Sequence, residues 1–555
     1  MKRFLLIALV VVVGLGAAAF IFRKPLILYT ATTIAKAQSK IAPNHPVEWQ
    51  QGPDQAATPL DQRPPNIVFI LADDLGINDI TTFGGGNAGG RVPTPNIDRL
   101  AKQGAIFSRA YSGSSTCAPS RAMIMTGRYP TRTGFEFTPT PNGMGRLVSM
   151  FANGDGSGLP PLDYDAKLDK SSPPFAQQGL PGKEVTISEV LRDAGYHTVH
   201  IGKWHLGLGP EFGPNAQGFD ESLLMASALY LPEHDPNVVN AKLSFDPIDK
   251  FLWARMQYAA AYNEGPWFKP GGYLTDWWTD EAIKVIHANR NRPFFLNVAE
   301  WGVHTPLQAT KADYDAVGDI QPHRARVYAA MVRSLDRSVG RIMDAVKTEG
   351  LADNTIFVFT SDNGAPGYIG IPKVNAPYRG WKLTLFEGGI RVPFFISWPG
   401  HIKPGTTIDA PVAHIDLMPT FADAAKAAIP VGDVIDGADL MPLAEGDPAA
   451  NPVPHDAIFW ESDYYQVVRQ GDWKLQTTKR PEKTWLFNLK DDPTEHHDLA
   501  AEMPDKVAEL KQLLADHRKG AVPPLYPSTT QSPVAIDKTA ADHFEKGDEY
   551  VYWPN

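Results

Sequence analysis

The chain has 555 residues, more than one hydrophobic core can hold, since single cores stop growing at about 250 to 300 residues. With 43% hydrophobic and 21% charged residues, its composition is globular and excludes a mainly disordered chain. A formal net charge of −10 without a long basic run argues against nucleic acid as a partner, and the single cysteine, Cys117, excludes both an internal disulfide and a zinc site built from several cysteines.

The amino terminus carries an export signal. Residues 4–22 form an uncharged apolar run, close to the length that a helix needs to span a hydrocarbon layer. The run is either a signal anchor, favoured by its length and by the basic pair that starts at Arg23, or a signal peptide, favoured by the small residues 17–19 as a cleavage site. We assign residues 1–24 to one of these two and residues 25–63 to a linker. Either interpretation predicts a periplasmic or other extracytoplasmic body, with a membrane anchor in the first case.

From residue 66 the chain alternates short apolar runs with helical patterns, which predicts an α/β fold with a largely parallel sheet. Charged or titratable side chains follow each of four such runs. Ligands of open α/β sheets bind outside the carboxyl ends of the strands, so we expect these side chains to share one site. The runs and the residues that follow them are 66–72 with Asp73 and Asp74, 196–201 with Lys203 and His205, 293–299 with His304, and 355–361 with Asp362 and Asn363.

Hard oxygen donors are concentrated at two of these strand ends, at Asp73, Asp74, Asp362 and Asn363. Carboxylate and amide oxygens suit Ca²⁺ or Mg²⁺ better than a soft metal, although three carboxylates are also found with Mn²⁺. Either motif alone could be an ordinary turn. Because both follow closely similar apolar strands, a metal site is the preferred interpretation.

Residues 112–127, SGSSTCAPSRAMIMTG, surround the cysteine. Pro119 suits the first turn of a helix and Gly127 suits its end, which places Cys117 at a helix amino terminus, where an anion is favoured, with Arg121 one turn further on. Polar neighbours argue against a cysteine that merely packs as a small hydrophobe. A thiolate hydrolase or a tyrosine-phosphatase-like loop is an alternative, but the latter needs a longer spacing between cysteine and arginine.

The segment 117–127 resembles the signature of the type I sulfatases, in which the cysteine is oxidised after translation to formylglycine, or 3-oxoalanine. Further motifs follow in the family's order over about residues 64–518. The resemblance implies an alkaline-phosphatase-like α/β/α sandwich with a large mixed, mainly parallel sheet, plus a smaller carboxy-terminal domain of antiparallel sheet and helix. The further motifs are Asp73-Asp74, GKWHLG at 202–207, HTP at 304–306, DNG at 362–364, Lys382 in GWKLTLFEGGIRVP, VAHID at 412–416 and GDWKL…WLFNLKDDPTEHHDLA at 471–500.

The same resemblance implies roles for ten residues. The side chain at 117 would bind one Ca²⁺ together with four oxygen donors, Mg²⁺ or Mn²⁺ being the weaker alternatives. The aldehyde hydrate would attack sulfur. A formylglycine-generating maturation enzyme and a small-molecule or carbohydrate sulfate ester are the implied partners. The implied roles are metal binding for Asp73, Asp74, Cys117, Asp362 and Asn363, positioning of the hydrate for Arg121 and Lys203, departure of the alcohol for Lys382 and His304, and regeneration of the aldehyde for His205.

Two other functional classes stay open. A phosphonate monoester or phosphodiester hydrolase could use the same nucleophile and fold, but the sulfatase-like Lys203 and His205 favour sulfate. A non-catalytic, membrane-tethered binding protein is disfavoured because none of the ten residues is missing.

The domain boundaries follow from the elements. Residues 64–425 are predicted to form the catalytic domain and 426–520 a smaller domain, followed by an extended arm at 521–555 that packs on its own body or on a neighbouring subunit. The smaller domain is expected to contain antiparallel strands at 458–460, 465–469, 473–477 and 485–488, and a helix at 504–518.

Two insertions, 136–178 and 208–270, depart most from a compact sulfatase, and long loops at a functional face usually shape substrate access. Aromatic residues of the second either line a pocket for an apolar or carbohydrate sulfate ester or, as we favour, form the insertion's own core. They are Tyr230, Phe251, Trp253, Tyr258, Tyr262 and Trp267.

Overall fold

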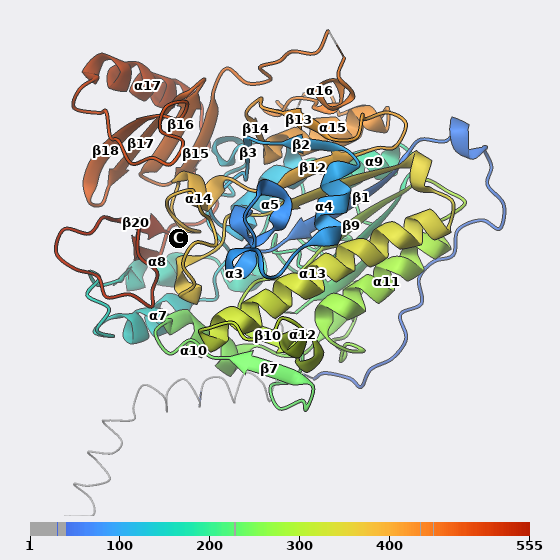
Figure 1. Cartoon of the computed structure of the whole chain (residues 1–555), viewed down its shortest axis with the longest axis horizontal. Coiled ribbons are helices and arrows are strands. Elements are labelled where there is room, and N and C mark those ends of the chain that lie inside the picture. The colour runs from blue at the N-terminus through green and yellow to red at the C-terminus, as the bar shows by residue number, and fades with distance from the viewer. Residues whose placement is uncertain (1–29, 31–39, 227–228, 433, 448) are drawn as a thin grey trace, which may run out of the picture.

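A large mixed sheet forms the centre of the structure, a computed structural model that describes residue 30 and residues 40–226, 229–432, 434–447 and 449–555 (Figure 1). Its strands pair in parallel except β12, which is antiparallel to both neighbours, and β8, which is antiparallel to β6. The predicted mixed, mainly parallel sheet is thereby confirmed. In spatial order its strands are β13 (Thr406–Ile408), β2 (Ala105–Phe107), β12 (Phe394–Ser397), β11 (Thr355–Ser361), β1 (Asn66–Ala72), β9 (Phe294–Ala299), β5 (His197–Gly202), β6 (Glu221–Met225) and β8 (Ala260–Tyr262).

The four strands predicted from the apolar runs are β1, β5, β9 and β11, and they are neighbours at the centre of this sheet. All seven residues of β1 are buried, as expected for a strand covered on both faces. Its last residue, Ala72, pairs with Ser361 of β11, and Leu71 pairs with Ala299 of β9. Because these strands are parallel and in register, their carboxyl ends meet at one edge, and the residues after them are brought together.

Alternate residues of β1 face two separate cores, which makes the domain a three-layer α/β/α sandwich. Val68 and Ile70 face the first core, with helices α4, α11 and α13, the last two of which run side by side across this face in Figure 1. Ile67 and Phe69 face the second core, with α5, α9, α15 and α16. The helices are α4 (Pro95–Lys102), α11 (Leu274–Ala288), α13 (His323–Thr348), α5 (Cys117–Thr126), α9 (Ile187–Asp193), α15 (Leu417–Ala424) and α16 (Met441–Glu445).

An antiparallel four-stranded sheet and a helix form the carboxy-terminal unit, at the upper left of Figure 1. Leu510 and Leu514 of the helix pack on the sheet's Val468, Leu475 and Leu486. The predicted strands and helix are confirmed, within a few residues at their ends. They are β15 (Ile458–Ser462), β16 (Tyr465–Gln470), β17 (Trp473–Lys479), β18 (Glu482–Asn488) and α17 (Pro504–His517).

The arm that follows packs on its own chain. Strand β19 (Thr530–Ala535) pairs with β20 (Tyr550–Pro554) and with β4 (Asp163–Tyr164) of the first insertion. That insertion also contains α7 (Met144–Ala152) and α8 (Ala166–Ser171).

The second insertion contributes β7 (Val238–Ala241), which pairs with β10 (Leu307–Thr310), and α10 (Pro247–Arg255). Tyr230, Phe251 and Trp253 are buried in the first core, together with Val68 and Ile70 of the large sheet. These three side chains are therefore core residues, but they belong to the core of the large sheet and not to a separate core of the insertion.

The predicted signal segment, residues 1–24, lies outside the described residues. Among the helices that the structure describes, none combines the length and the apolar character needed to cross a membrane. Part of the predicted linker is packed: Val47 and Trp49 are buried, and Ala42 pairs with Phe268 beside the edge strand β8. Trp49 Nε1 also donates a hydrogen bond of 2.8 Å to Glu281.

Candidate active site

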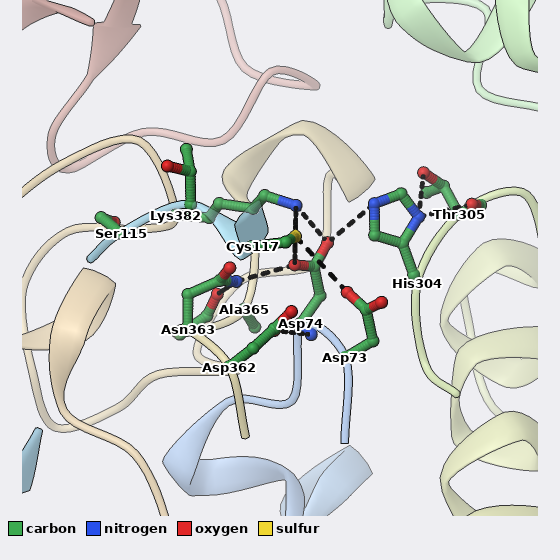
Figure 2. Close-up of polar contacts among 12 residues, drawn as sticks. Asp73, Asp74, Ser115, Cys117, His304, Thr305, Asp362, Asn363, Ala365 and Lys382 are labelled. Atoms are coloured by element: carbon green, nitrogen blue, oxygen red, sulfur yellow. Dashed lines mark hydrogen bonds and ion pairs between the residues drawn. The ribbon is translucent and has the colours of Figure 1, made fainter. Parts of the chain in front are cut away.

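The residues predicted for the site converge at the carboxyl edge of the central sheet. Figure 2 shows Asp73, Asp74, Cys117, His304, Asp362, Asn363 and Lys382. Asp73 and Asp74 follow β1, Asp362 and Asn363 follow β11, and Lys203 follows β5 directly. His304 lies in the loop between β9 and β10, Cys117 and Arg121 lie on α5, and Lys382 lies five residues before α14 (Glu387–Ile390). The parallel order of the central strands accounts for this convergence.

Asp74 lies at the middle of the cluster. Its Oδ1 accepts hydrogen bonds of 2.7 Å from both Asn363 Nδ2 and Lys382 Nζ, and its backbone N–H donates to Asp362 Oδ1 at 3.2 Å. Ligand atoms of Asp73, Asp74, Cys117 and His304 all lie within 4.8 Å of one another. Ligand atoms this close to one another can bind one cation.

Three buried cations compensate the buried carboxylates. Arg121 Nη2 lies 2.8 Å from Asp362 and 3.2 Å from Asp73, and Lys203 Nζ lies 2.6 Å from Asp73. Lys382 bonds both carboxylate oxygens of Asp74, at 2.7 and 2.9 Å. Burying a charge without such partners would be costly, so the carboxylates and cations depend on one another.

The pKa values of the carboxyl groups reflect this arrangement. Burial, strengthened by the charge of Asp362, raises the pKa of Asp73 to about 7. Burial acts in the same direction on Asp74, but the positive charges of the site, that of Lys382 foremost, outweigh it and lower the pKa. Lys382 keeps its proton, because Asp74 raises its pKa well above the usual value despite burial.

Cys117 is the first residue of α5, and every residue of that helix is buried. Its Sγ lies 3.6 Å from Asp73 Oδ1 and 3.2 Å from Lys382 Nζ. Burial, with the charge of Asp362, raises the pKa of the Cys117 thiol. A thiol that stays protonated at neutral pH is a poor nucleophile, which argues against the thiolate hydrolase considered above.

His304 is fixed by two contacts. Its Nδ1 lies 2.6 Å from the Thr305 carbonyl oxygen, and its ring stacks on Trp301 with centroids 4.2 Å apart. Since a carbonyl only accepts, Nδ1 carries the hydrogen and Nε2 faces Asp74, with 3.6 Å between Nε2 and Oδ2. Burial lowers the pKa of His304 to about 3.

His205 lies two residues after Lys203 with a left-handed backbone, φ +65°. Among the described residues its buried Nδ1 has no hydrogen-bond partner. Burial, together with the charge of Lys203, lowers the pKa of His205 well below the usual value. A neutral imidazole with a free ring nitrogen can accept a proton.

The donor set of Asp73, Asp74, Asp362 and Asn363 fits a hard divalent cation such as Ca²⁺ or Mg²⁺. It consists of carboxylate and amide oxygens, the hard ligands that Ca²⁺ prefers. Asn363 Oδ1 is buried, and no group among the described residues donates a hydrogen bond to it. Buried acceptors normally have a hydrogen-bond partner. A cation bound beside Asp74 and Asp362 would give this oxygen a partner.

Sequence reasoning missed two residues. Tyr368 donates a hydrogen bond of 3.0 Å to Asp74 Oδ2, and only its position five residues after Asn363 pointed to it. His414 lies 3.1 Å from both Ser120 of α5 and Thr360 of β11. It lies in the VAHID motif already noted, but its buried contacts could not be read from that motif.

This fold and site define a hydrolase of anionic esters with an alkaline-phosphatase-like fold. The family model described as Sulfatase matches residues 65–427. The chain therefore belongs to the sulfatase family and is a sulfuric ester hydrolase. A second model, described as N-sulphoglucosamine sulphohydrolase, C-terminal, matches residues 380–520.

Individual relatives support the same assignment. The N-acetylgalactosamine-6-sulfatase of Mus musculus is 31% identical, over 83% of this chain and 87% of its own. Arylsulfatase A of Homo sapiens is 31% identical, over 81% of this chain and 87% of its own. Among solved structures, Ps i-CgsB is 30% identical with a TM-score of 0.68, covering 84% of this chain and 95% of its own, and it has also been solved in complex with k-i-k-neocarrahexaose.

Proposed function

We propose that the chain hydrolyses its sulfate ester through a formylglycine made from Cys117 and one bound Ca²⁺. The observation that supports this most directly is the position of Cys117 Sγ, 3.2 Å from Lys382 Nζ and 3.6 Å from Asp73 Oδ1. A group at this position lies between the metal-binding carboxylates and a cation that can bind sulfate.

Four oxygen donors and residue 117 would hold the metal. When bound, the calcium ion supplies positive charge that polarises the sulfate. Lys203 and Arg121, which already contact Asp73 and Asp362, orient these carboxyl groups. The donors are Asp73, Asp74, Asp362 and Asn363.

The formylglycine hydrate supplies an oxygen nucleophile that attacks sulfur and can later return to a carbonyl. Arg121 and Lys203 position its hydroxyl groups from the α5 and β5 sides of the site. His205 takes the proton of the remaining hydroxyl group, which lets sulfate leave. The Nδ1 of His205, which has no hydrogen-bond partner in the part of the chain that the structure describes, supports this base role.

Departure of the alcohol requires a proton on its oxygen. Lys382 stays protonated and contacts the sulfate. The anionic ester also favours the protonated form of His304, whose Nε2–H then donates to the leaving oxygen as the sulfur–oxygen bond breaks. The Nδ1 contact with Thr305 supports this orientation of Nε2.

The mass of the tryptic peptide 110–121 tests the modification. In active protein we expect an aldehyde in place of the cysteine CH₂SH group, and full activity with an unmodified thiol would refute the mechanism. Cys117→Ala should abolish sulfate-ester turnover. The matched control is Ser115→Ala, beside the site but with its Oγ bonded to the Gly389 carbonyl.

A phosphonate monoester or phosphodiester hydrolase of the same superfamily is the second candidate. The sulfatase-like pair Lys203 and His205 favours sulfate esters. Turnover of 4-nitrophenyl sulfate and of a phenylphosphonate monoester by one preparation separates the two, and faster phosphonate turnover would reverse the assignment. A third class, a non-catalytic binding protein, predicts no turnover of either.

The substrate class, the export and the partners complete the proposal. The substrate is an aryl, other small-molecule or carbohydrate sulfate ester, as in the names of the relatives. The apolar residues 4–22 support export, as a signal peptide or as an anchor. A formylglycine-generating enzyme is required as a partner. Edman sequencing of the mature protein distinguishes cleavage near residue 19 from retention of the segment.

A further inference from the structure

Tyr230 connects the second insertion to the loop that carries His304. It lies between β6 and β7 and its side chain is fully buried. Its hydroxyl donates a hydrogen bond of 2.6 Å to the backbone carbonyl of Trp301 and lies 2.9 Å from that of His304. A single donor is thus shared by carbonyls at both ends of this four-residue turn.

The ring of Tyr230 belongs to a column of stacked aromatic rings that ends at His304. Tyr273 stacks on Tyr230 with centroids 5.4 Å apart, and Tyr230 stacks on Trp301 at 6.2 Å. Trp301 in turn stacks on His304 at 4.2 Å, with 20° between the ring planes. Such stacks restrict the tilt of each ring, so the orientation of His304 depends on its neighbours.

Other groups leave His304 few further restraints. Its Nδ1 contact is to the adjacent residue, Thr305, and therefore moves with the same loop. Its Nε2 lies 3.6 Å from Asp74, beyond ordinary hydrogen-bond distance. The backbone of Tyr230 is held outside this loop, because its N–H donates a hydrogen bond of 2.8 Å to Gln308 Oε1 of β10.

We propose that Tyr230 is a positioning residue for His304: its hydroxyl holds the 301–304 turn, and its ring supports the stack that directs Nε2 at the leaving oxygen. The inference rests on the role of His304 in the proposed function. Proton transfer depends steeply on donor geometry, and a positioned acid contributes about 10²-fold to 10⁴-fold. A displaced His304 should therefore slow the hydrolysis of esters with poor leaving groups most, since their leaving oxygen depends most on the donated proton.

The test is Tyr230→Phe, with Tyr273→Phe as the matched control. Tyr273 is the next ring of the column, and its hydroxyl donates to the Gln308 carbonyl at 2.8 Å rather than to the 301–304 turn. We would measure kcat/KM for 4-nitrophenyl, 4-chlorophenyl and phenyl sulfates. For Tyr230→Phe we expect a loss on the order of tenfold or more for phenyl sulfate and below about threefold for 4-nitrophenyl sulfate. For Tyr273→Phe we expect the same small factor for all three.

A uniform loss across the three esters in Tyr230→Phe would overturn the inference, because a merely structural role has no leaving-group dependence. His304→Ala calibrates the experiment. If it shows no leaving-group dependence, the proposed role of His304 fails. If it shows the dependence and Tyr230→Phe does not, only the inference about Tyr230 fails.

A double-mutant cycle adds a second criterion. Tyr230→Phe should cost little further in the His304→Ala background, whereas additive losses would show that Tyr230 acts elsewhere. Should Tyr230→Phe not fold, Trp301→Phe keeps an aromatic ring and the backbone carbonyl while weakening the stack. The same leaving-group-selective loss is expected there, and a uniform loss overturns the proposal.

Discussion

Lys474 Nζ lies 2.9 Å from Glu387 Oε1, and both side chains are completely buried. Lys474 belongs to β17 of the carboxy-terminal sheet, whereas Glu387 lies five residues after Lys382 of the active site. A second carboxylate, Glu495, lies 2.9 Å from the same ammonium group. The hydroxyl oxygen of Tyr465 in β16 accepts a hydrogen bond of 3.0 Å from the backbone N–H of Leu385. The carboxy-terminal sheet therefore holds the segment that presents Lys382.

Lys474→Met should destabilise the protein strongly, because two buried carboxylates then lose their common cation. Removing one partner of a buried ion pair typically costs about 3 to 5 kcal/mol. Urea unfolding measures the loss. Lys479→Met, at the exposed end of the same strand, is the control and should change little. Equal stabilities of the two variants would contradict the structural role of Lys474.

Asn363→Ala should weaken Ca²⁺ binding, because it removes the buried Oδ1 that has no hydrogen-bond partner among the described residues. We expect the affinity for Ca²⁺ to fall about tenfold or more. Losing a residue that only supports a metal ligand already costs about this much. Isothermal titration with Ca²⁺ measures it independently of activity. Asn78→Ala, at a half-buried asparagine whose side chain donates to the Lys373 carbonyl, should bind as the unchanged protein does. Unaltered affinity in Asn363→Ala would remove this residue from the metal site.

Glu300→Gln should reduce the pH dependence of stability. Burial raises the pKa of Glu300 from 4.5 to about 8, and Ser338 donates a hydrogen bond of 2.7 Å to its carboxyl group. Between these two pKa values the folded chain holds a proton that the unfolded chain releases. The contribution of Glu300 is thus fully present below pH 4.5 and is lost as the pH rises through 8.

Urea unfolding at about pH 5, 6.5 and 8, which span the interval between the two pKa values, would measure this contribution. The free energy of unfolding of Glu300→Gln should fall less with rising pH than that of the unchanged protein. The exposed Glu502→Gln serves as the reference. Parallel pH profiles for all three proteins would show that Glu300 is not protonated in the folded chain.

Arg379→Ala should loosen residues 536–549 of the arm. Arg379 bonds both carboxylate oxygens of Asp537, at 2.6 and 2.7 Å, and also pairs with Glu549. Without these contacts, trypsin should cut after the exposed Lys546 several-fold faster, as followed by mass spectrometry. Arg341→Ala removes an ion pair with Asp280 on the helical face and should leave this rate unchanged. Cleavage at the same rate in both variants would show that other contacts retain the arm.

Local sequence patterns predicted the elements that build the centre of the site. The bounds of β1 and β11 agree with the predicted runs, because fully buried strands between turn-forming residues are distinct in composition. Helix α5 begins at Cys117 and ends before a left-handed Gly127, as Pro119 and Gly127 indicated. The resemblance to sulfatases then assigned roles to side chains that these elements present.

Contacts between distant segments could not be predicted in this way. Tyr230 lies 71 residues before Trp301, and nothing in its own surroundings distinguishes a core tyrosine from one that holds an active-site turn. The pairing of the arm with β4 likewise depends on shape and register across the whole chain. Such contacts depend on tertiary packing, which short-range periodicity does not encode.

The burial of Cys117 limits the time at which a modifying enzyme can reach this residue. Only 3% of the residue is exposed, and all of α5 around it is packed, so a modifying enzyme has no access to it once the domain has folded. Lys382, which closes the site over the sulfur, comes 265 residues later in the chain. If Cys117 is converted as proposed, synthesis of that stretch would set the interval in which the thiol is accessible. Under the proposed mechanism, a chain that folds before conversion would stay inactive, so the yield of active enzyme would depend on the relative rates of folding and modification.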